Sequence, residues 1–312
     1  MKKYILAGVG VLALAFASRL EALNVSSDFS TNPLTGGGWS FGAGNNSNSQ
    51  FAWNAAGSSL QVHVDSSLPT VRLDLPIGAP LTTGTDFTLS CRFSFTVTSA
   101  PNNEGMQFAF GLVNHTLTGG NRTGTPTDFG SDNVFNTVEF NYFPNVSPAF
   151  NSGRTLAPAV FGAEVVGQDA FFNSALMFGS GSNLGDNTVP PQIDQLPQAT
   201  LLLATLDYSA ATKLLALTVQ QVNPDLSLTT LDTGVPARDL SGLSPTFAVD
   251  SLAITAYADG FNGDPFSSPL VALVGDMDIR QIAVSSPVPE PASGLLILFS
   301  GGVLALARRR RA

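Results

Sequence analysis

Hydrophobic and polar residues alternate in short runs along the middle of the chain. Phe93 and Phe95 fall on one face of such a run, and Phe108 and Phe110 share a face of another. Gly, Pro, Asn and Asp separate the runs, and no stretch of residues 23–285 has the amphipathic period of a helix. The pattern predicts an all-β sandwich or barrel. The runs are SLQVHV, DFTLSCRFSFTVTS, MQFAFGLVN, NTVEFNYF, ATLLLATLDY, KLLALTVQQV, DSLAITAYA and GDMDIRQIAV.

Residues 1–22 have the composition of a secretory signal peptide. Two lysines give a positive start, residues 4–17 are apolar, and small residues suited to cleavage follow at Ala17 or Ala22. An N-terminal membrane anchor is the alternative, for which the apolar run is short.

The C-terminal segment, residues 286–312, has three parts. Three prolines keep its start extended. Residues 293–307 are apolar but short for a bilayer span, which needs roughly 20 residues. Four arginines, Arg308, Arg309, Arg310 and Arg311, nearly end the chain and would stay cytoplasmic, because a membrane interior excludes them. The segment predicts a short transmembrane helix that acts as a processing signal.

Val288, Pro289, Glu290 and Pro291, with the apolar run and the arginines after them, resemble the PEP-CTERM sorting signal of Gram-negative bacteria. The resemblance implies that the inner membrane holds the exported chain by its C-terminus until an exosortase-type transpeptidase cuts near these four residues. It also implies release to the cell surface or extracellular matrix, in bacteria that make exopolysaccharide. A plain C-terminal anchor is the alternative.

Charge excludes one class of partner. Charged residues are 12% of the 312 residues, and the formal net charge is −9. Half of the basic residues stand in the terminal segments, so the middle is more acidic than the whole chain. We expect no nucleic-acid partner, because phosphates require a basic surface. Cys91 is the only cysteine, so an internal disulfide is excluded, and its place in an alternating run predicts burial.

Three stretches resemble the concanavalin A-like jelly roll of L-type lectins. They are DFTLSCRFSFTVTSAPNNEGMQFAFGL, VFNTVEFNYFPN and ATLDYSAATKLLALTV, within residues 50–220. The resemblance implies a single jelly-roll β-sandwich over residues 23–285, flanked by the signal peptide and the C-terminal transmembrane helix. Laminarinase-type glycoside hydrolases share this fold, so a binding domain and an enzyme both have to be considered.

In these lectins, a Glu-Phe-Asp-x-Phe-x-Asn strand binds paired Mn and Ca ions, and Glu139 and Asn145 match its first and last residues. Asn141 replaces the Asp that bridges both ions, which removes negative charge that a hard-cation site requires. We therefore expect no two-metal site and expect Glu139 to point outward as an ordinary polar strand residue. The resemblance leaves Glu139 and Asn145 as ligand-binding candidates.

Sugar binding has further candidates. Glu104 stands where the lectins place the Asp that accepts hydrogen bonds from sugar hydroxyls. Glu is one methylene longer, and a carboxylate before Gly105 is also an ordinary turn residue. Trp39, Trp53 and Tyr142 are candidates for an aromatic platform, and each also suits the core.

A loop is a candidate for calcium, the only cofactor that the sequence suggests. Asp259, Asn262 and Asp264 offer oxygen ligands close together, and two glycines between them allow tight curvature. Asp276 and Asp278 alternate on one strand face and can add ligands if that strand lies nearby. An ordinary turn is the alternative.

An enzyme is not expected. A retaining glycosidase needs two carboxylates about 5 Å apart, and the strand of Glu139 offers one of the three that laminarinases carry. His63 and His115, the only histidines, have no Gly-x-Ser-x-Gly partner and no metal-binding spacing. The sequence predicts an exported, non-catalytic protein that binds polysaccharide. A structural matrix protein without a specific ligand and a glycoside hydrolase are the alternatives.

Overall fold

The computed structural model describes residues 22–42, 50–65, 71–99, 108–118, 135–143, 155–166, 168, 173–176, 196–231, 237–256 and 274–287. Residues 24–285 form one compact unit, and the described residues contain no α-helix. The strands are β1 (Leu23–Ser27), β2 (Ser40–Phe41), β3 (Phe51–Asn54), β4 (Ser59–Asp65), β5 (Val71–Thr82), β6 (Phe87–Ser99), β7 (Phe108–Val113), β8 (Thr137–Phe143), β9 (Thr155–Phe161), β10 (Ser174–Leu176), β11 (Leu202–Ser209), β12 (Leu214–Val222), β13 (Leu228–Thr230), β14 (Arg238–Asp239), β15 (Ala248–Ala256) and β16 (Val274–Ser286).

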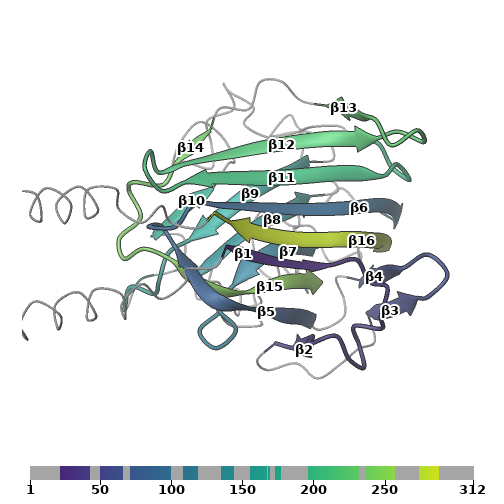
Figure 1. Ribbon diagram of the computed structural model, residues 1–312, viewed down its shortest axis with the longest axis horizontal. Coiled ribbons are helices and arrows are strands. Elements are labelled where there is room, and N and C mark those ends of the chain that lie inside the picture. Colours follow the sequence, from purple (N-terminus) through teal and green to yellow (C-terminus); the bar gives the residue numbers. More distant parts are fainter. Residues whose placement is uncertain are drawn as a thin grey trace, which may run out of the picture. The chain divides into compact units, whose positions relative to one another are not determined.

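Two antiparallel sheets form the sandwich (Figure 1). One sheet has nine strands, in the order β13-β12-β11-β6-β16-β4-β3, with β1 paired to β16 and β14 paired to β12. The other has seven strands, in the order β10-β9-β8-β7-β15-β5-β2. In each sheet a late strand lies between two early ones: β16 between β6 and β4, and β15 between β7 and β5. The predicted all-β sandwich is confirmed.

Aromatic side chains from both sheets meet in the core. The ring of Phe93 on β6 lies 4.9 Å from that of Phe110 on β7, and Phe110 lies 4.9 Å from Phe140 on β8. The predicted faces are confirmed, because Phe93 and Phe95 are buried together, as are Phe108 and Phe110. Removing these rings from water is the main stabilising contribution.

Two titratable side chains are part of this packing. Cys91 is buried, as predicted, and burial raises the pKa of its thiol well above the ordinary value, because a thiolate there would lose its hydration. The hydroxyl of Tyr208 donates to the carbonyl of Thr83 at 2.9 Å. Burial, followed by the negative charge of Asp86, raises the pKa of Tyr208, so the phenol remains neutral and keeps that hydrogen bond.

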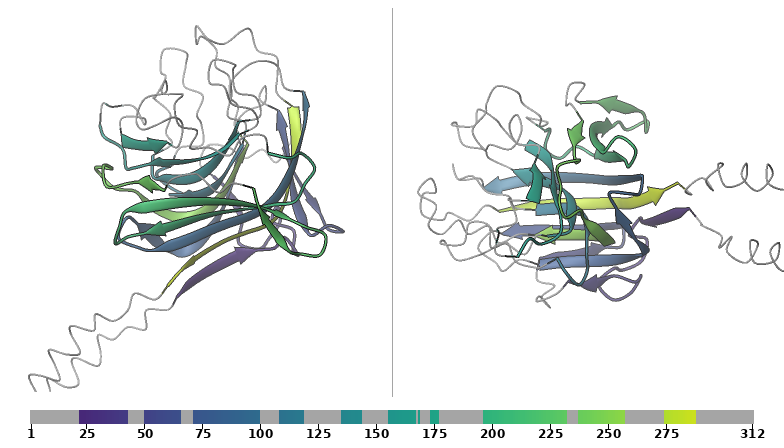
Figure 2. Two further views of the ribbon diagram at one scale, coloured as in Figure 1. Left: turned by 90° about the horizontal axis from the view of Figure 1, so that it is seen from above. Right: turned by 90° about the vertical axis from the view of Figure 1, so that its left-hand side faces the viewer.

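The chain enters and leaves the sandwich at one end. β1 and β16 are neighbours in the nine-stranded sheet, and Figure 2 shows β1 starting at the end of the sheet where β16 finishes. The last strand therefore runs directly into the C-terminal segment.

Several predictions concern residues outside the described part of the chain. These are the signal peptide except Ala22, the apolar run 293–307, Val288, Pro289, Glu290, Pro291, the four arginines, Glu104, Asn145, Asp259, Asn262 and Asp264. Within the described residues, no helix is both long and apolar enough to cross a membrane.

Replacing Phe110 with alanine should lower the free energy of unfolding by about 3–5 kcal/mol, because a buried ring that contacts both sheets is replaced by a cavity. Urea unfolding of residues 23–285, followed by tryptophan fluorescence, measures the loss. Val166→Ala is the control, since Val166 is 91% exposed and its truncation should change stability by less than about 0.5 kcal/mol. Equal losses for the two variants would contradict this core.

Candidate functional site

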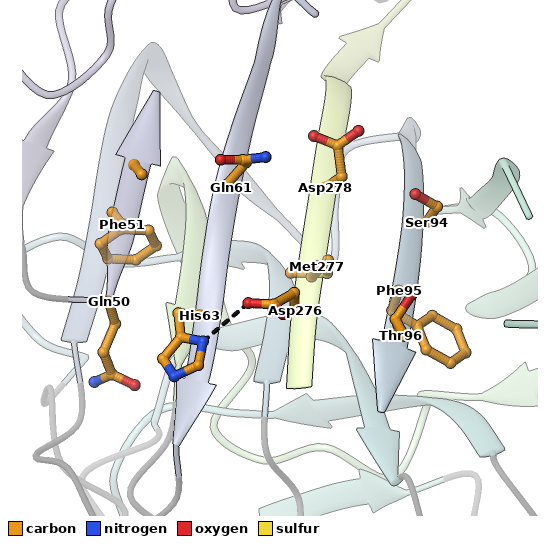
Figure 3. A pocket seen from close by; sticks show the side chains of 11 residues that line it. Gln50, Phe51, Gln61, His63, Ser94, Phe95, Thr96, Asp276, Met277 and Asp278 are labelled. Atoms are coloured by element: carbon orange, nitrogen blue, oxygen red, sulfur yellow. Dashed lines mark hydrogen bonds and ion pairs between the residues drawn. The ribbon is translucent and has the colours of Figure 1, made fainter. Parts of the chain in front are cut away.

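A polar surface lies on the outer face of the nine-stranded sheet, where β4, β16 and β6 are neighbours (Figure 3). On these strands Val62, Met277 and Phe95 are buried toward the core, so the residues beside them point outward. The outward residues are Gln61 and His63 on β4, Asp276 and Asp278 on β16, and Ser94 and Thr96 on β6. We call these six the groove residues.

The strand register aligns the groove residues in two parallel rows. The rows are Gln61, Asp278 and Ser94, and His63, Asp276 and Thr96. Neighbouring strands lie about 4.8 Å apart, so each row offers polar groups at regular steps across the sheet. Ala52 on β3 continues the first row, and its methyl group leaves the row open at that end.

The rows line an open groove with a volume of about 440 Å³, within the roughly 300–1,000 Å³ that small-ligand sites occupy. The remaining lining residues are Gln50, Phe51, Ala52, Phe95 and Met277. The described lining contains no lysine or arginine, and its two phenylalanines are buried. The groove is therefore polar and acidic.

His63 and Asp276 form a hydrogen-bonded pair across two strands. Nδ1 of His63 lies 2.9 Å from Oδ1 of Asp276, and the two side chains are 48% and 66% exposed. With Nδ1–H as the donor, the bond fixes the imidazole ring and leaves Nε2 directed away from the carboxylate. The pair thus offers a ligand an oriented ring nitrogen and a second carboxylate oxygen.

Other groove residues keep hydrogen-bonding groups without a partner. The side chains of Gln61, Ser94 and Thr96 form no hydrogen bond in the described part of the chain. Oδ1 of Asp278 is buried and unpartnered there, while its Oδ2 accepts from Nε of Arg280 at 3.3 Å. A buried acceptor without a donor is destabilising. Because that oxygen is enclosed, the unpartnered groups that a ligand can reach are those of Gln61, Ser94 and Thr96.

A second polar cluster lies on the outer face of the seven-stranded sheet. Arg72 and Asp74 stand two residues apart on β5, and their side chains are 3% and 0% exposed. The guanidinium donates to both carboxylate oxygens at 2.9–3.2 Å, and Nη1 donates to the carbonyl of Thr118 at 2.7 Å. Nδ1 of His115 lies 2.9 Å from Oδ2 of Asp74. We call Arg72, Asp74 and His115 the Arg72 cluster.

The Arg72 cluster fastens the turn at residues 114–118 to the sheet. The backbone N–H of His115 donates to Oδ1 of Asp250 at 2.8 Å. Gly42 donates to the carbonyl of Arg72, and a Cβ at position 42 would lie 2.5 Å from Nε of that arginine, so no larger residue fits. Because these contacts are all internal, the cluster has a structural role.

The expectation that Glu139 points outward as an ordinary polar strand residue is wrong as to its exposure. Glu139 alternates with Val138 and Phe140 on β8, as predicted, but it is only 2% exposed. Its neighbours on β7 and β9 are Gly111 and Ala159, and a Cβ on Gly111 would lie 2.6 Å from that of Glu139. These small residues make room for the carboxylate, which the fold encloses.

The predicted aromatic platform does not form at the groove. Trp39 and Trp53 are half-buried, and neither lines it. Nε1 of Trp53 donates to the carbonyl of Phe29 at 2.9 Å, and Nε1 of Trp39 donates to Oγ of Ser27 at 3.3 Å. Tyr142 lies in β8, and its side chain is outside the described residues.

Sequence reasoning had treated His63, Asp276 and Asp278 separately, and the structure brings them together. It had missed Gln61, Ser94 and Thr96. The alternation in SLQVHV and DFTLSCRFSFTVTS already placed these three on outer faces. The missing information was the pairing of β16 between β4 and β6, since residues near position 277 then meet residues near 62 and 95.

No metal site is found in the described residues, where no group of three or more His, Cys, Asp or Glu is placed to hold an ion. The calcium candidates Asp259, Asn262 and Asp264 lie outside this part of the chain. Calcium at that loop therefore stays a prediction.

Residues 287–311 match a family model described as the PEP-CTERM protein-sorting motif. The matched stretch contains Val288, Pro289, Glu290, Pro291 and the four arginines, so the predicted sorting signal is confirmed. The motif implies export, membrane anchoring before processing, and processing by an exosortase-like system. The sequence has no match among curated proteins.

The similar solved structures include several lectins. The winged bean acidic lectin complexed with methyl-α-D-galactose is 13% identical, with 86% of this chain and 100% of that chain covered and a TM-score of 0.47. Peanut lectin with a 9mer peptide is 12% identical, with coverage of 86% and 98% and a TM-score of 0.46. The carbohydrate recognition domain of Emp47p is 13% identical, with coverage of 85% and 96% and a TM-score of 0.43. These similarities assign no ligand to this chain.

Asp74→Ala should lower the free energy of unfolding by about 3–5 kcal/mol, because it leaves Arg72 buried without its carboxylate. Urea unfolding measures the loss. The control is Asp207→Ala on the outer face of β11, where the exposed carboxylate accepts one hydrogen bond, from Thr88. Its loss should stay below about 1 kcal/mol. Similar losses for both variants would show that the Arg72 cluster does not hold the fold.

Proposed function

We propose that this chain is an exported, non-catalytic protein of the cell surface or extracellular matrix of a Gram-negative bacterium, where it binds polysaccharide through the groove. An exosortase-type transpeptidase removes the C-terminal anchor, and exopolysaccharide is the partner outside the cell. One observation carries the proposal: Gln61, Ser94 and Thr96 line the groove with hydrogen-bonding side chains that have no partner in the described chain.

The chemistry of the groove matches that of sugar hydroxyls, each of which both donates and accepts hydrogen bonds. Carboxylates accept, the amide of Gln61 does both, and the hydroxyls of Ser94 and Thr96 do both. Because the two rows repeat with the strand spacing, an extended polysaccharide lying across β4, β16 and β6 meets suitable groups at each step.

Affinity at one groove should be low. The described lining has no exposed aromatic ring, so stacking on a sugar face is not available there. Each hydrogen bond exchanged with water contributes only about 0.5–1.5 kcal/mol net. A polymer with many equivalent segments raises the apparent affinity when it engages several copies of the protein.

The environment of the two groove carboxylates supports a binding role over hydrolysis. Asp276 is 66% exposed and bonded to His63, and Asp278 accepts from Arg280. A catalytic acid requires surroundings that keep its proton on at neutral pH, usually an apolar pocket. The lining around Asp276 and Asp278 is polar and no apolar pocket encloses them.

Gln61→Ala combined with Thr96→Val should weaken polysaccharide binding by about ten-fold, since two hydrogen bonds to the ligand are lost. A glycan array on residues 23–285 identifies the ligand, and calorimetry with that ligand compares the variants. The reducing ends released during the same incubation report hydrolysis, and we expect none.

The matched control is Gln220→Ala combined with Thr218→Val. Both residues lie on the outer face of β12 in the same sheet, away from the groove. This variant should bind like the unaltered protein. Equal weakening of binding in both variants would show that the groove is not the binding site. An array without any hit would favour a structural matrix protein without a specific ligand.

The extracellular protein from native cells should end near Val288–Pro291 and should yield no peptide that contains Arg308–Arg311. The arginines act as the membrane stop, because moving one to the bilayer centre costs about 3 kcal/mol on insertion scales. Mass spectrometry of the C-terminal peptide measures the cut. An intact end at Ala312 in the extracellular form would indicate a plain anchor.

A further inference from the structure

The centre of the groove carries negative charge without a cation in its described lining. Asp276 and Asp278 stand two residues apart on β16, the middle strand of the three, and no lysine or arginine lines the groove. Arg280 pairs with Oδ2 of Asp278 at 3.3 Å, and Oδ1 of Asp278 is buried, whereas the side chain of Asp276 is 66% exposed. The carboxylate of Asp276 is therefore the one that a donor from a ligand can reach.

This charge distribution predicts which classes of polysaccharide the groove binds more tightly. A uronate or sulfate group beside Asp276 would meet a charge of the same sign, and no lysine or arginine in the lining offsets the repulsion. A hydroxyl donates one hydrogen bond, whereas a primary ammonium donates up to three and brings the opposite charge. Hydrogen bonds between charged groups are roughly twice as strong as those between neutral ones. An ammonium is thus preferred to a hydroxyl, and a hydroxyl to a carboxylate.

We infer that the groove binds a polysaccharide with free amino groups, such as one built from N-deacetylated hexosamine units. The inference rests on the proposed function and specifies the chemical class of its ligand. The exposed carboxylate of Asp276 accepts the ammonium, while Asp278, about 7 Å further along the same face of β16, is held by Arg280. Hydroxyls of the same sugar units reach Gln61 and Ser94 in one row and Thr96 in the other.

A divalent cation fits these carboxylates less well. Ca²⁺ takes six to eight oxygen ligands, usually with several carboxylates. In the described part of the chain no group of three or more metal-ligating side chains is placed to hold an ion. An ammonium needs at most three acceptors, which the carboxylate of Asp276 and neighbouring oxygens such as the hydroxyl of Thr96 supply.

Three oligosaccharides of equal length are the probes: one of glucosamine, its N-acetylated counterpart, and an oligogalacturonate. Calorimetry uses the full chain in non-ionic detergent with a chelator present. We expect the glucosamine probe to bind about ten-fold more tightly than the N-acetylated one, and the oligogalacturonate not to bind. Raising the salt concentration from about 50 mM to about 500 mM should weaken binding of the glucosamine probe far more than binding of the N-acetylated probe.

Asp276→Asn combined with Asp278→Asn removes both charges and keeps the side-chain size. This variant should bind the glucosamine probe no more tightly than the N-acetylated one. Asp207→Asn combined with Asp225→Asn makes the same change in net charge on β11 and in the turn before β13. It should keep the ten-fold preference, which excludes general attraction to an acidic protein.

Equal affinity for the glucosamine and N-acetylated probes would overturn the inference and leave polysaccharide binding by the groove intact. The same loss of preference in both double variants would also overturn it, as would binding that appears only when calcium replaces the chelator. The inference would also be overturned if none of the three probes bound. In that case the glycan array tests the proposed polysaccharide binding separately.

Discussion

The pairing of β16 with β6 and β4 is the interaction on which both the fold and the candidate site depend. β16 is the last strand of the sandwich, yet it pairs with β6 along nearly its whole length and with β4 from Val274 to Ile279. Its inner face buries Met277, Ile279, Ile282 and Val284, and its outer face carries Asp276 and Asp278. Without this strand the nine-stranded sheet would be divided, and its central groove would not exist.

Because the last strand completes the sheet, its position constrains both folding and the later processing of the chain. Pairing between residues near 90 and residues near 280 is long-range, so it forms only after the chain up to β16 is available. The sorting motif begins at residue 287, directly after Ser286. In the exported chain the last structural strand and the processing signal are therefore contiguous, and cleavage there leaves the sandwich with its central strand complete.

Much of the fold could be predicted from the sequence, because alternation is a local property. It gave the strands and the buried faces of Phe93, Phe110 and Cys91, and the sorting signal is equally local. Burial of Glu139 could not be predicted, because alternation indicates the face of a residue and not whether that face is covered. The groove required the strand order, since Gln61, Asp276 and Thr96 are far apart in the chain and meet only through pairing.

The central claim is that the ligand binds on the outer face of the nine-stranded sheet, where outward polar groups repeat with the strand spacing. A crystal structure of the sandwich with the oligosaccharide that it binds most tightly tests this directly. The account predicts sugar density across β4, β16 and β6, with a ligand donor within hydrogen-bonding distance of the carboxylate of Asp276. Sugar bound against the seven-stranded sheet near Glu139, with the groove unoccupied, would contradict it.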